Sequence, residues 1–268
     1  MPELATRVAS ALVLAALAIG AVLISPWTFL LLVIAASCVI AWEWGRLTRG
    51  DGFDRIAAVQ MLGVALALTL VALGRPAFAL GALGVTTLAL AAASAGTQSL
   101  SWALAGLAYA ALPAAALVWL RSDTALGATA VLYLLAVAAT ADTAAYAAGR
   151  LIGGAKLAPR ISPNKTWSGF AAGLLAPALV GCAFAAYLGG TSAAWLAFVS
   201  VALALACQMG DLIESAAKRR FGTKDMSALI PGHGGLLDRI DSLLLAAVLA
   251  ALISLRDPTN PASGLLIW

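Results

Sequence analysis

The chain has very little charge for its length: 10% of its 268 residues are Asp, Glu, Lys or Arg, and 63% are hydrophobic. A soluble domain typically has about 25% charged and about 45–50% apolar residues, so this deficit excludes a soluble globular protein. The alternating segments of about ten residues that build a transmembrane barrel are lacking as well. Because a helix satisfies its backbone hydrogen bonds within the segment, the sequence predicts an all-α, polytopic integral membrane protein.

Residues and motifs of common enzyme sites are also scarce. Cys38, Cys182 and Cys207 lie far apart inside apolar runs, so neither a disulfide framework nor a zinc site is expected. There is no G-x-S-x-G serine elbow, no plausible Cys–His pair and no G-x-x-x-x-G-K-[ST] phosphate loop. Carboxylates and cations are therefore the groups left for chemistry.

Apolar runs separated by Pro, Gly or charged residues predict nine membrane spans. They approach the roughly 17–25 residues that a spanning helix needs. The predicted spans are 8–24, 27–42, 56–73, 77–93, 100–120, 125–147, 167–188, 193–213 and 240–255. The first run could pass for a signal peptide, but more spans follow and no A-x-A-like cleavage site stands out, which favours an uncleaved helix.

Lys and Arg are distributed unevenly between the two sides that these spans define. With a cytoplasmic N-terminus, thirteen lie on the cytoplasmic side and three on the other. The positive-inside rule therefore predicts a multi-pass protein of the inner (cytoplasmic) membrane with its N-terminus in the cytoplasm. The loops 148–166 and 214–239 then both face the cytoplasm, where nucleotides are found. Residues 1–120 are interpreted as a scaffold of spans and residues 121–268 as the catalytic region.

Acidic residues are rare in apolar segments, yet four occur in them or at their ends: Asp142, Asp211, Glu214 and Asp241. A carboxylate at the bilayer centre costs about 2.5–3.5 kcal/mol on insertion scales, so such a residue indicates function. The spacing of Asp211, Glu214 and Lys218 puts them on one helix face, together with Ser215. Helix-end polar groups at the interface are the alternative interpretation.

Asp238 and Asp241 stand three residues apart at the start of the last predicted span. Two carboxylate-bearing helix ends on one membrane side suit a hard cation such as Mg²⁺, which takes oxygen ligands and usually one or two carboxylates. A structural salt bridge from Asp238 to Arg239 or to a loop lysine is the alternative.

The segment RLIGGAKLAPRISPNKTWSG, residues 150–169, has four basic residues and no acid. Its Gly153-Gly154 pair and two prolines disfavour a regular helix, and its hydroxyl and amide groups suit a phosphate cradle. A topogenic loop that touches anionic headgroups is equally compatible with this segment. His233, the chain's one histidine, lies in Pro-Gly-His-Gly-Gly and could donate to phosphate or carry a proton; a merely solvated loop histidine is the alternative.

Carboxylates for a metal and many cations on one side suit the joining of two polyanions by phosphoryl or nucleotidyl transfer. Catalysis there is mostly positioning and charge neutralisation. A phosphate nucleophile is already ionised near pH 7, so the lack of an obvious general base is expected.

Three segments resemble the phosphatidate cytidylyltransferases, also called CDP-diacylglycerol synthases. The pattern S-x-x-K-R-x4-K-D-x-S-x2-I-P-x-H-G-G-L-x-D-R-I-D, from Ser215 to Asp241, is similar to the family signature. ADTAAYAAGRLIGGAKLAPRISPNKTWSGF, residues 141–170, and QMGDLIES, residues 208–215, resemble it too. Departures at Ala144, Gly154, Ser168 and Ala217 concern the fine geometry of the substrate site.

The resemblance implies a Mg²⁺-dependent reaction, with one or two metal ions left open, in which CTP and phosphatidic acid give CDP-diacylglycerol and pyrophosphate. It also implies a homodimer. The implied metal ligands are Asp211 and Asp238, supported by Asp241 and Glu214. The residues expected to act in catalysis are Asp142, Lys165, Lys218, Lys224 and His233. Those expected to bind substrate are Ser162, Asn164, Thr166, Ser215, Arg219, Asp225 and Arg239.

Three other functions are weighed against this one. A CDP-alcohol phosphotransferase requires D-G-x2-A-R-x8-G-x3-D-x3-D, and Asp51-Gly52 has neither the A-R pair nor the spaced aspartates after it. A coupled transporter should place its acids toward the midplane and often has inverted repeats, whereas these acids gather beside basic loops. A related prenol or lipid kinase-like enzyme is the remaining alternative.

Overall fold

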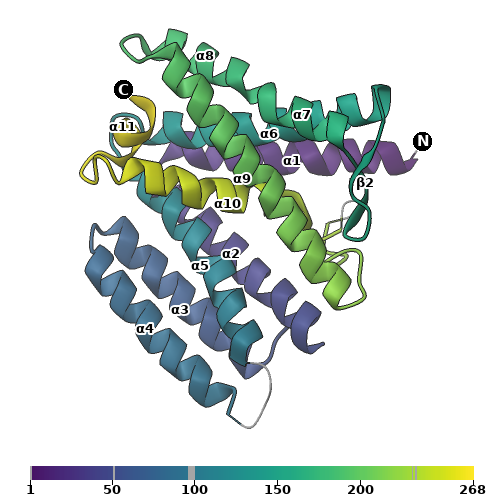
Figure 1. Cartoon of the computed structure of the whole chain (residues 1–268). Coiled ribbons are helices and arrows are strands. Elements are labelled where there is room, and N and C mark those ends of the chain that lie inside the picture. Colours follow the sequence, from purple (N-terminus) through teal and green to yellow (C-terminus); the bar gives the residue numbers. More distant parts are fainter. Residues whose placement is uncertain (1, 51, 96–99, 231, 233) are drawn as a thin grey trace. The chain divides into compact units, whose positions relative to one another are not determined.

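The computed structural model describes residues 2–50, 52–95, 100–230, 232 and 234–268, with side chains from residue 9 onward (Figure 1). Helices make up nearly all of its regular structure. They are α1 (Pro2–Ile24), α2 (Pro26–Arg49), α3 (Arg55–Ala72), α4 (Pro76–Ala93), α5 (Leu100–Arg121), α6 (Gly127–Leu151), α7 (Trp167–Leu175), α8 (Pro177–Leu188), α9 (Ala193–Arg220), α10 (Leu237–Ser254) and α11 (Pro261–Leu266).

All nine predicted spans are helical, which confirms the all-α, multi-pass membrane architecture. Within the described residues, seven helical stretches are long and apolar enough to cross a membrane: α2, α3, α4, α5, α6, α9 and the stretch Trp167–Leu188 formed by α7 and α8. The other two predicted spans are α1, whose apolar part Ala9–Ile24 is shorter, and α10. Three of the first five residues of α10 are charged, which sets it apart from the seven.

Two predicted loops are shorter than expected because the preceding helices continue. Helix α6 runs to Leu151 and α9 to Arg220, so the expected loops 148–166 and 214–239 each begin with helix. Residues that follow α6 form an antiparallel hairpin of β1 (Lys156–Ala158) and β2 (Ser162–Thr166), where the sequence predicted only irregular loop. Gly153 and Gly154 end the helix as expected, since both have positive φ angles, +67° and +102°.

The chain divides into two compact units. Unit 1 contains Met1–Ser122 and Phe221–Ile240, and unit 2 contains Asp123–Arg220 and Asp241–Trp268. The chain leaves unit 2 after α9 and returns to it within α10.

In unit 1, α2 packs against α1, α3 and α5, and α3 packs against α4 and α5. Ser25 caps α2 through a capping box with Thr28, and Pro26 occupies the first helical position, where its missing N–H is not needed. Small residues allow close contacts between helices: a Cβ on Gly63 would lie 2.1 Å from the Thr86 hydroxyl. Gly63 therefore sets the separation of α3 and α4.

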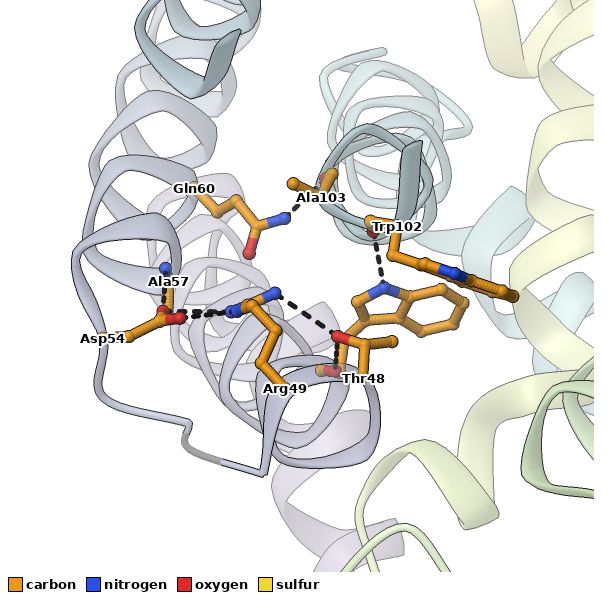
Figure 2. A network of polar contacts seen from close by, with 8 residues as sticks. Thr48, Arg49, Asp54, Ala57, Gln60, Trp102 and Ala103 are labelled. Carbon is orange, nitrogen blue, oxygen red and sulfur yellow. Dashed lines mark hydrogen bonds and ion pairs between the residues drawn. The ribbon is translucent and has the colours of Figure 1, made fainter. Parts of the chain in front are cut away.

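The turn between α2 and α3 is held by an ion pair, shown in Figure 2. Arg49 donates from Nη2 to Asp54 Oδ1 at 3.0 Å and from Nε to the other carboxylate oxygen, while Ala57 N–H donates to Oδ1 at 2.8 Å. Partial burial raises the pKa of Asp54, whereas its hydrogen bonds with Arg49 and Ala57 and the Arg49 charge lower it. The lowering is the larger effect, so the pKa lies below its ordinary value. Asp54 thus acts as an ionised N-cap of α3.

Polar side chains also join α5 to its neighbours in the same region (Figure 2). The Gln60 amide of α3 donates to the Ala103 carbonyl at 2.7 Å, and the Trp44 indole of α2 donates to the Trp102 carbonyl at 2.8 Å. Gly106 permits this approach, because a Cβ there would lie 2.4 Å from the Trp44 ring. Helices α2, α3 and α5 therefore form one tightly packed group.

In unit 2, α6 packs against α7, α8, α9 and α11, and α8 packs along α9. The predicted span 167–188 is two helices, because Pro177 starts a new helix directly after Ala176. The Tyr133 hydroxyl of α6 is fully buried and lies 2.7 Å from the Ser200 hydroxyl of α9. Gly173 lets α7 approach α6, since a Cβ there would lie 2.8 Å from the Ala141 carbonyl oxygen.

Candidate active site

A lysine from the hairpin pairs with the first acid on the predicted face of α9. Lys165 Nζ lies 2.7 Å from Asp211 Oδ2, with side-chain exposures of 23% and 31%. One turn along α9, the Ser215 hydroxyl donates to Asp211 Oδ1 at 3.2 Å. The Ser215–Asp211 hydrogen bond confirms the predicted helical spacing. The Lys165–Asp211 pair is accessible to a solute because both side chains are partly exposed.

The next pair along the same face is more deeply buried. Lys218 Nζ lies 2.6 Å from Glu214 Oε2, and the Glu214 side chain is 0% exposed. A buried carboxylate needs a cation or several hydrogen bonds to remain charged. Glu214 is therefore enclosed by protein, in contrast to Asp211, and is less suited to direct contact with a substrate or metal.

Other predicted residues of the basic segment organise the hairpin itself. Thr166 is buried and caps α7, because its hydroxyl accepts from Gly169 N–H at 3.1 Å. Arg219 donates from Nε to the Ile161 carbonyl at 3.2 Å, which ties the end of α9 to the hairpin. Ser162 is half-buried and Asn164 is exposed on β2. Thr166 thus has a structural role in the free protein, whereas Asn164 is accessible to substrate.

Two further acids of unit 2 meet at the start of its α10 segment. The Ser242 hydroxyl donates to Asp142 Oδ2 at 3.1 Å, and Ser242 N–H donates to Asp241 Oδ1 at 2.7 Å. Asp241 lies within electrostatic range of the Asp142 and Asp211 carboxylates and of Lys218. A Cβ on Gly210 would lie 2.6 Å from the Asp241 carbonyl oxygen, so α9 and α10 touch here. Four sequence-predicted acids are therefore gathered in this unit.

The remaining predicted residues belong to unit 1, in the segment between α9 and α10 and in the first turn of α10. Asp238 Oδ2 accepts from Met226 N–H at 2.9 Å and from Gly235 N–H at 2.8 Å. The sequence left two roles open for Asp238, a metal ligand and a salt-bridge partner. The structure shows another role, because its carboxylate links Met226 to Gly235 through backbone hydrogen bonds. Three other predicted residues of this segment are exposed, namely Lys224, Asp225 and Arg239. His233 lies outside the described residues.

One acid that contacts this segment, Glu43, was not among the predicted site residues. Its fully buried carboxylate accepts from Ser227, Leu236 and Leu237. The predicted span ended at residue 42, which assigned Glu43 to a charged loop, but α2 continues to Arg49. For the other acids, a carboxylate in an apolar helix was taken to indicate function. The same rule would have selected Glu43 if the predicted helix had ended later in the sequence.

The candidate metal ligands have suitable donor chemistry. Mg²⁺ takes oxygen ligands, usually one or two carboxylates together with substrate phosphates, and unit 2 gathers carboxylates that repel one another around Asp241. Among the residues that the structure describes, no group of three or more His, Cys, Asp or Glu side chains is arranged to hold a metal ion alone. The carboxylates of unit 2 are therefore oxygen donors of the kind that Mg²⁺ takes.

Comparison with known proteins places the chain in a family. The model of the cytidylyltransferase family matches residues 5–255. A phosphatidate cytidylyltransferase of Brucella suis is 38% identical over 271 residues, covering 98% of both chains. Phosphatidate cytidylyltransferases of Mycobacterium leprae and Staphylococcus saprophyticus are 44% and 40% identical over 124 and 127 residues, covering 46% and 47% of this chain and 40% and 49% of their own. The chain belongs to the cytidylyltransferase family.

Proposed function

We propose that this protein transfers a cytidylyl group from CTP to phosphatidic acid, which yields CDP-diacylglycerol and pyrophosphate for phospholipid synthesis. The observation that carries the proposal is the 38% identity to a phosphatidate cytidylyltransferase over 98% of both chains. The gathering of acids and cations in unit 2 supports the same chemistry.

The reaction needs charge neutralisation rather than a general base. A phosphatidate oxygen attacks the α-phosphorus of CTP, a new P–O bond forms, and the bond to the β-phosphate oxygen breaks so that pyrophosphate leaves with the electron pair. Lys165, Lys218, Arg219 and Lys224 are assigned to neutralise the phosphates. Positioning and neutralisation of this kind supply most of the rate in phosphoryl-transfer enzymes.

A Mg²⁺ ion, when bound, would supply further neutralisation of the phosphate oxygens. Asp211 is the first choice as its ligand because its carboxylate is accessible and its cation partner Lys165 has a flexible side chain. Asp241 and Asp142 are the neighbouring oxygen donors, and Glu214 supports them from within the fold. Asp238, in unit 1, keeps the ligand assignment that the family resemblance implies, in addition to its loop contacts.

The proposal includes the side of the membrane and the assembly. The excess of Lys and Arg on one side supports a cytoplasmic N-terminus and a cytoplasmic active site. That location suits an enzyme whose lipid substrate diffuses in the bilayer and whose nucleotide comes from water. A homodimer is proposed on the family resemblance alone.

Pyrophosphate release by the purified protein in detergent tests the proposal. Release should require CTP and phosphatidic acid, should depend on Mg²⁺, and should be lost in Asp211→Asn. Asp257→Asn is the matched control, because the partly exposed Asp257 carboxylate accepts from Thr259 and Asn260 in its own loop. Equal activity of the two variants would contradict the assignment of Asp211.

A further inference from the structure

Glu43 makes an unusual set of contacts for an acid in an apolar helix. Its Oε1 accepts from the Ser227 hydroxyl at 2.6 Å and from Leu236 N–H at 2.9 Å, and its Oε2 accepts from Leu237 N–H at 2.8 Å. The Glu43 side chain is 0% exposed, and its partners are 184 to 194 residues away in the sequence. One carboxylate of α2 therefore binds both ends of the segment between Ser227 and Leu237.

These contacts satisfy donors that the local sequence leaves open. The first backbone N–H groups of a helix have no intrahelical partner, and the positive end of the helix dipole favours a negative charge there. Leu236 and Leu237 supply such groups at the start of α10. Glu43 thus acts as an N-cap from a distant helix.

Glycine at position 235 is matched to this carboxylate. A Cβ on Gly235 would lie 2.4 Å from Glu43 Oε1 and 3.0 Å from the Met226 Cβ. Its φ angle is not in the positive region, so the requirement for glycine comes from the contact rather than from the backbone conformation. The sequence G-G-L at 234–236 is therefore fitted to an acid that lies far from it in the chain.

Several residues assigned to the reaction lie next to the residues that Glu43 binds. Asp238 accepts from Met226 and Gly235 N–H, so two carboxylates hold the residues at 226–227 and 235–237. Lys224 and Asp225 precede Ser227 in the chain, Arg239 follows Leu237 in the first turn of α10, and all three are exposed. Their positions depend on the backbone that Glu43 and Asp238 hold.

We infer that Glu43 is a positioning residue for the substrate-binding segment 224–239, acting through Ser227, Leu236 and Leu237 rather than by contact with substrate. The catalytic part of this inference rests on the proposed cytidylyl transfer, whereas the structural part does not. It assigns a role in the active site to the N-terminal half of the chain.

The first test compares Glu43→Gln with a matched control, Ser37→Ala. Glutamine keeps the shape of the side chain but replaces one acceptor with an NH₂ group, which cannot accept from the donors that face it. Ser37 is also a buried polar residue of α2, and its hydroxyl donates to the Ala110 carbonyl in α5, away from the segment. We expect kcat for pyrophosphate release to fall by about 10²-fold in Glu43→Gln and to stay at the wild-type value in Ser37→Ala.

Hydrogen exchange supplies a readout that does not require activity. In Glu43→Gln, a peptide covering residues 234–240 should exchange faster, while peptides from α3, α4 and α9 keep wild-type protection. Faster exchange throughout the chain would identify Glu43 as a general stabilising residue and overturn the inference. Wild-type kcat together with wild-type exchange in 234–240 would overturn it as well.

A second substitution tests the same contact from residue 235. Gly235→Ala should lower kcat by about 10²-fold in the wild-type background but have little further effect in Glu43→Ala, which lacks the clashing oxygen. An equal loss in both backgrounds would place the clash elsewhere and refute the role of Glu43. If the wild-type protein releases no pyrophosphate, the proposed function fails, and hydrogen exchange at 234–240 still decides whether Glu43 positions the segment.

Discussion

Replacement of Lys165 by methionine separates a catalytic role from a structural one by magnitude. The Lys165–Asp211 pair is 2.7 Å long but its side chains are 23% and 31% exposed. Solvent-exposed ion pairs of this kind contribute about 0–1 kcal/mol to stability. A cation aimed at a reacting phosphate contributes far more to the transition state, about 2.7–4 kcal/mol by analogy with a removed oxyanion donor. Since each 1.36 kcal/mol changes a rate about tenfold, Lys165→Met should lose about 10²–10³-fold in kcat with little loss of stability.

The assay pairs pyrophosphate release with thermal unfolding in the same detergent. Arg49→Met is the matched control, because it also removes an ion pair at a helix end, with Asp54, but lies in the turn between α2 and α3. We expect Arg49→Met to lower the unfolding midpoint at least as much as Lys165→Met while keeping wild-type kcat. A Lys165→Met protein with near-wild-type kcat, or one whose activity loss follows its loss of stability, would refute the reasoning.

Two further predictions concern the fold. Gly173→Ala should lower stability by about 1–3 kcal/mol because its Cβ would meet the Ala141 carbonyl at 2.8 Å, whereas Gly84→Ala, with no atom within 4 Å, should be neutral or stabilising; equal thermal midpoints for the two variants would contradict the packing argument. The folded-state pKa of Asp54 lies below its ordinary value, so its contribution is present above the unfolded pKa of about 3.9 and is lost as pH falls through the folded pKa. The difference in thermal midpoint between wild type and Asp54→Asn should therefore shrink between pH 7 and pH 3, and a constant difference would count against an ionised cap.

The spans and the shared face of α9 could be predicted because both depend on local pattern. Apolar runs punctuated by Pro and Gly mark helices wherever the chain crosses lipid, and the spacing of Asp211 and Ser215 alone places them one turn apart. Their hydrogen bond confirms that spacing. The pairing of Lys165 with Asp211 could not be predicted from local pattern, because it depends on how the hairpin folds against α9.

Helix ends were less predictable. Because the predicted span ended at residue 42, Glu43 was not included among the candidate site residues. Charged residues such as Glu43 and Lys218 resemble loop residues in a hydropathy pattern, yet α2 and α9 both continue through them. A buried carboxylate is compatible with a helix only when distant donors satisfy it. Those donors come from residues 227–237, and the sequence around Glu43 gives no indication of them.

The most direct test of the proposed reaction follows the phosphorus atoms of CTP. Purified protein is incubated with phosphatidic acid and CTP labelled at either the α- or the γ-phosphate, and the lipid is extracted. Cytidylyl transfer predicts that the α-label enters the lipid and the γ-label leaves as pyrophosphate. Transfer of the γ-label to lipid, or no transfer of the α-label by a folded protein, would contradict the proposal and favour a lipid kinase-like activity.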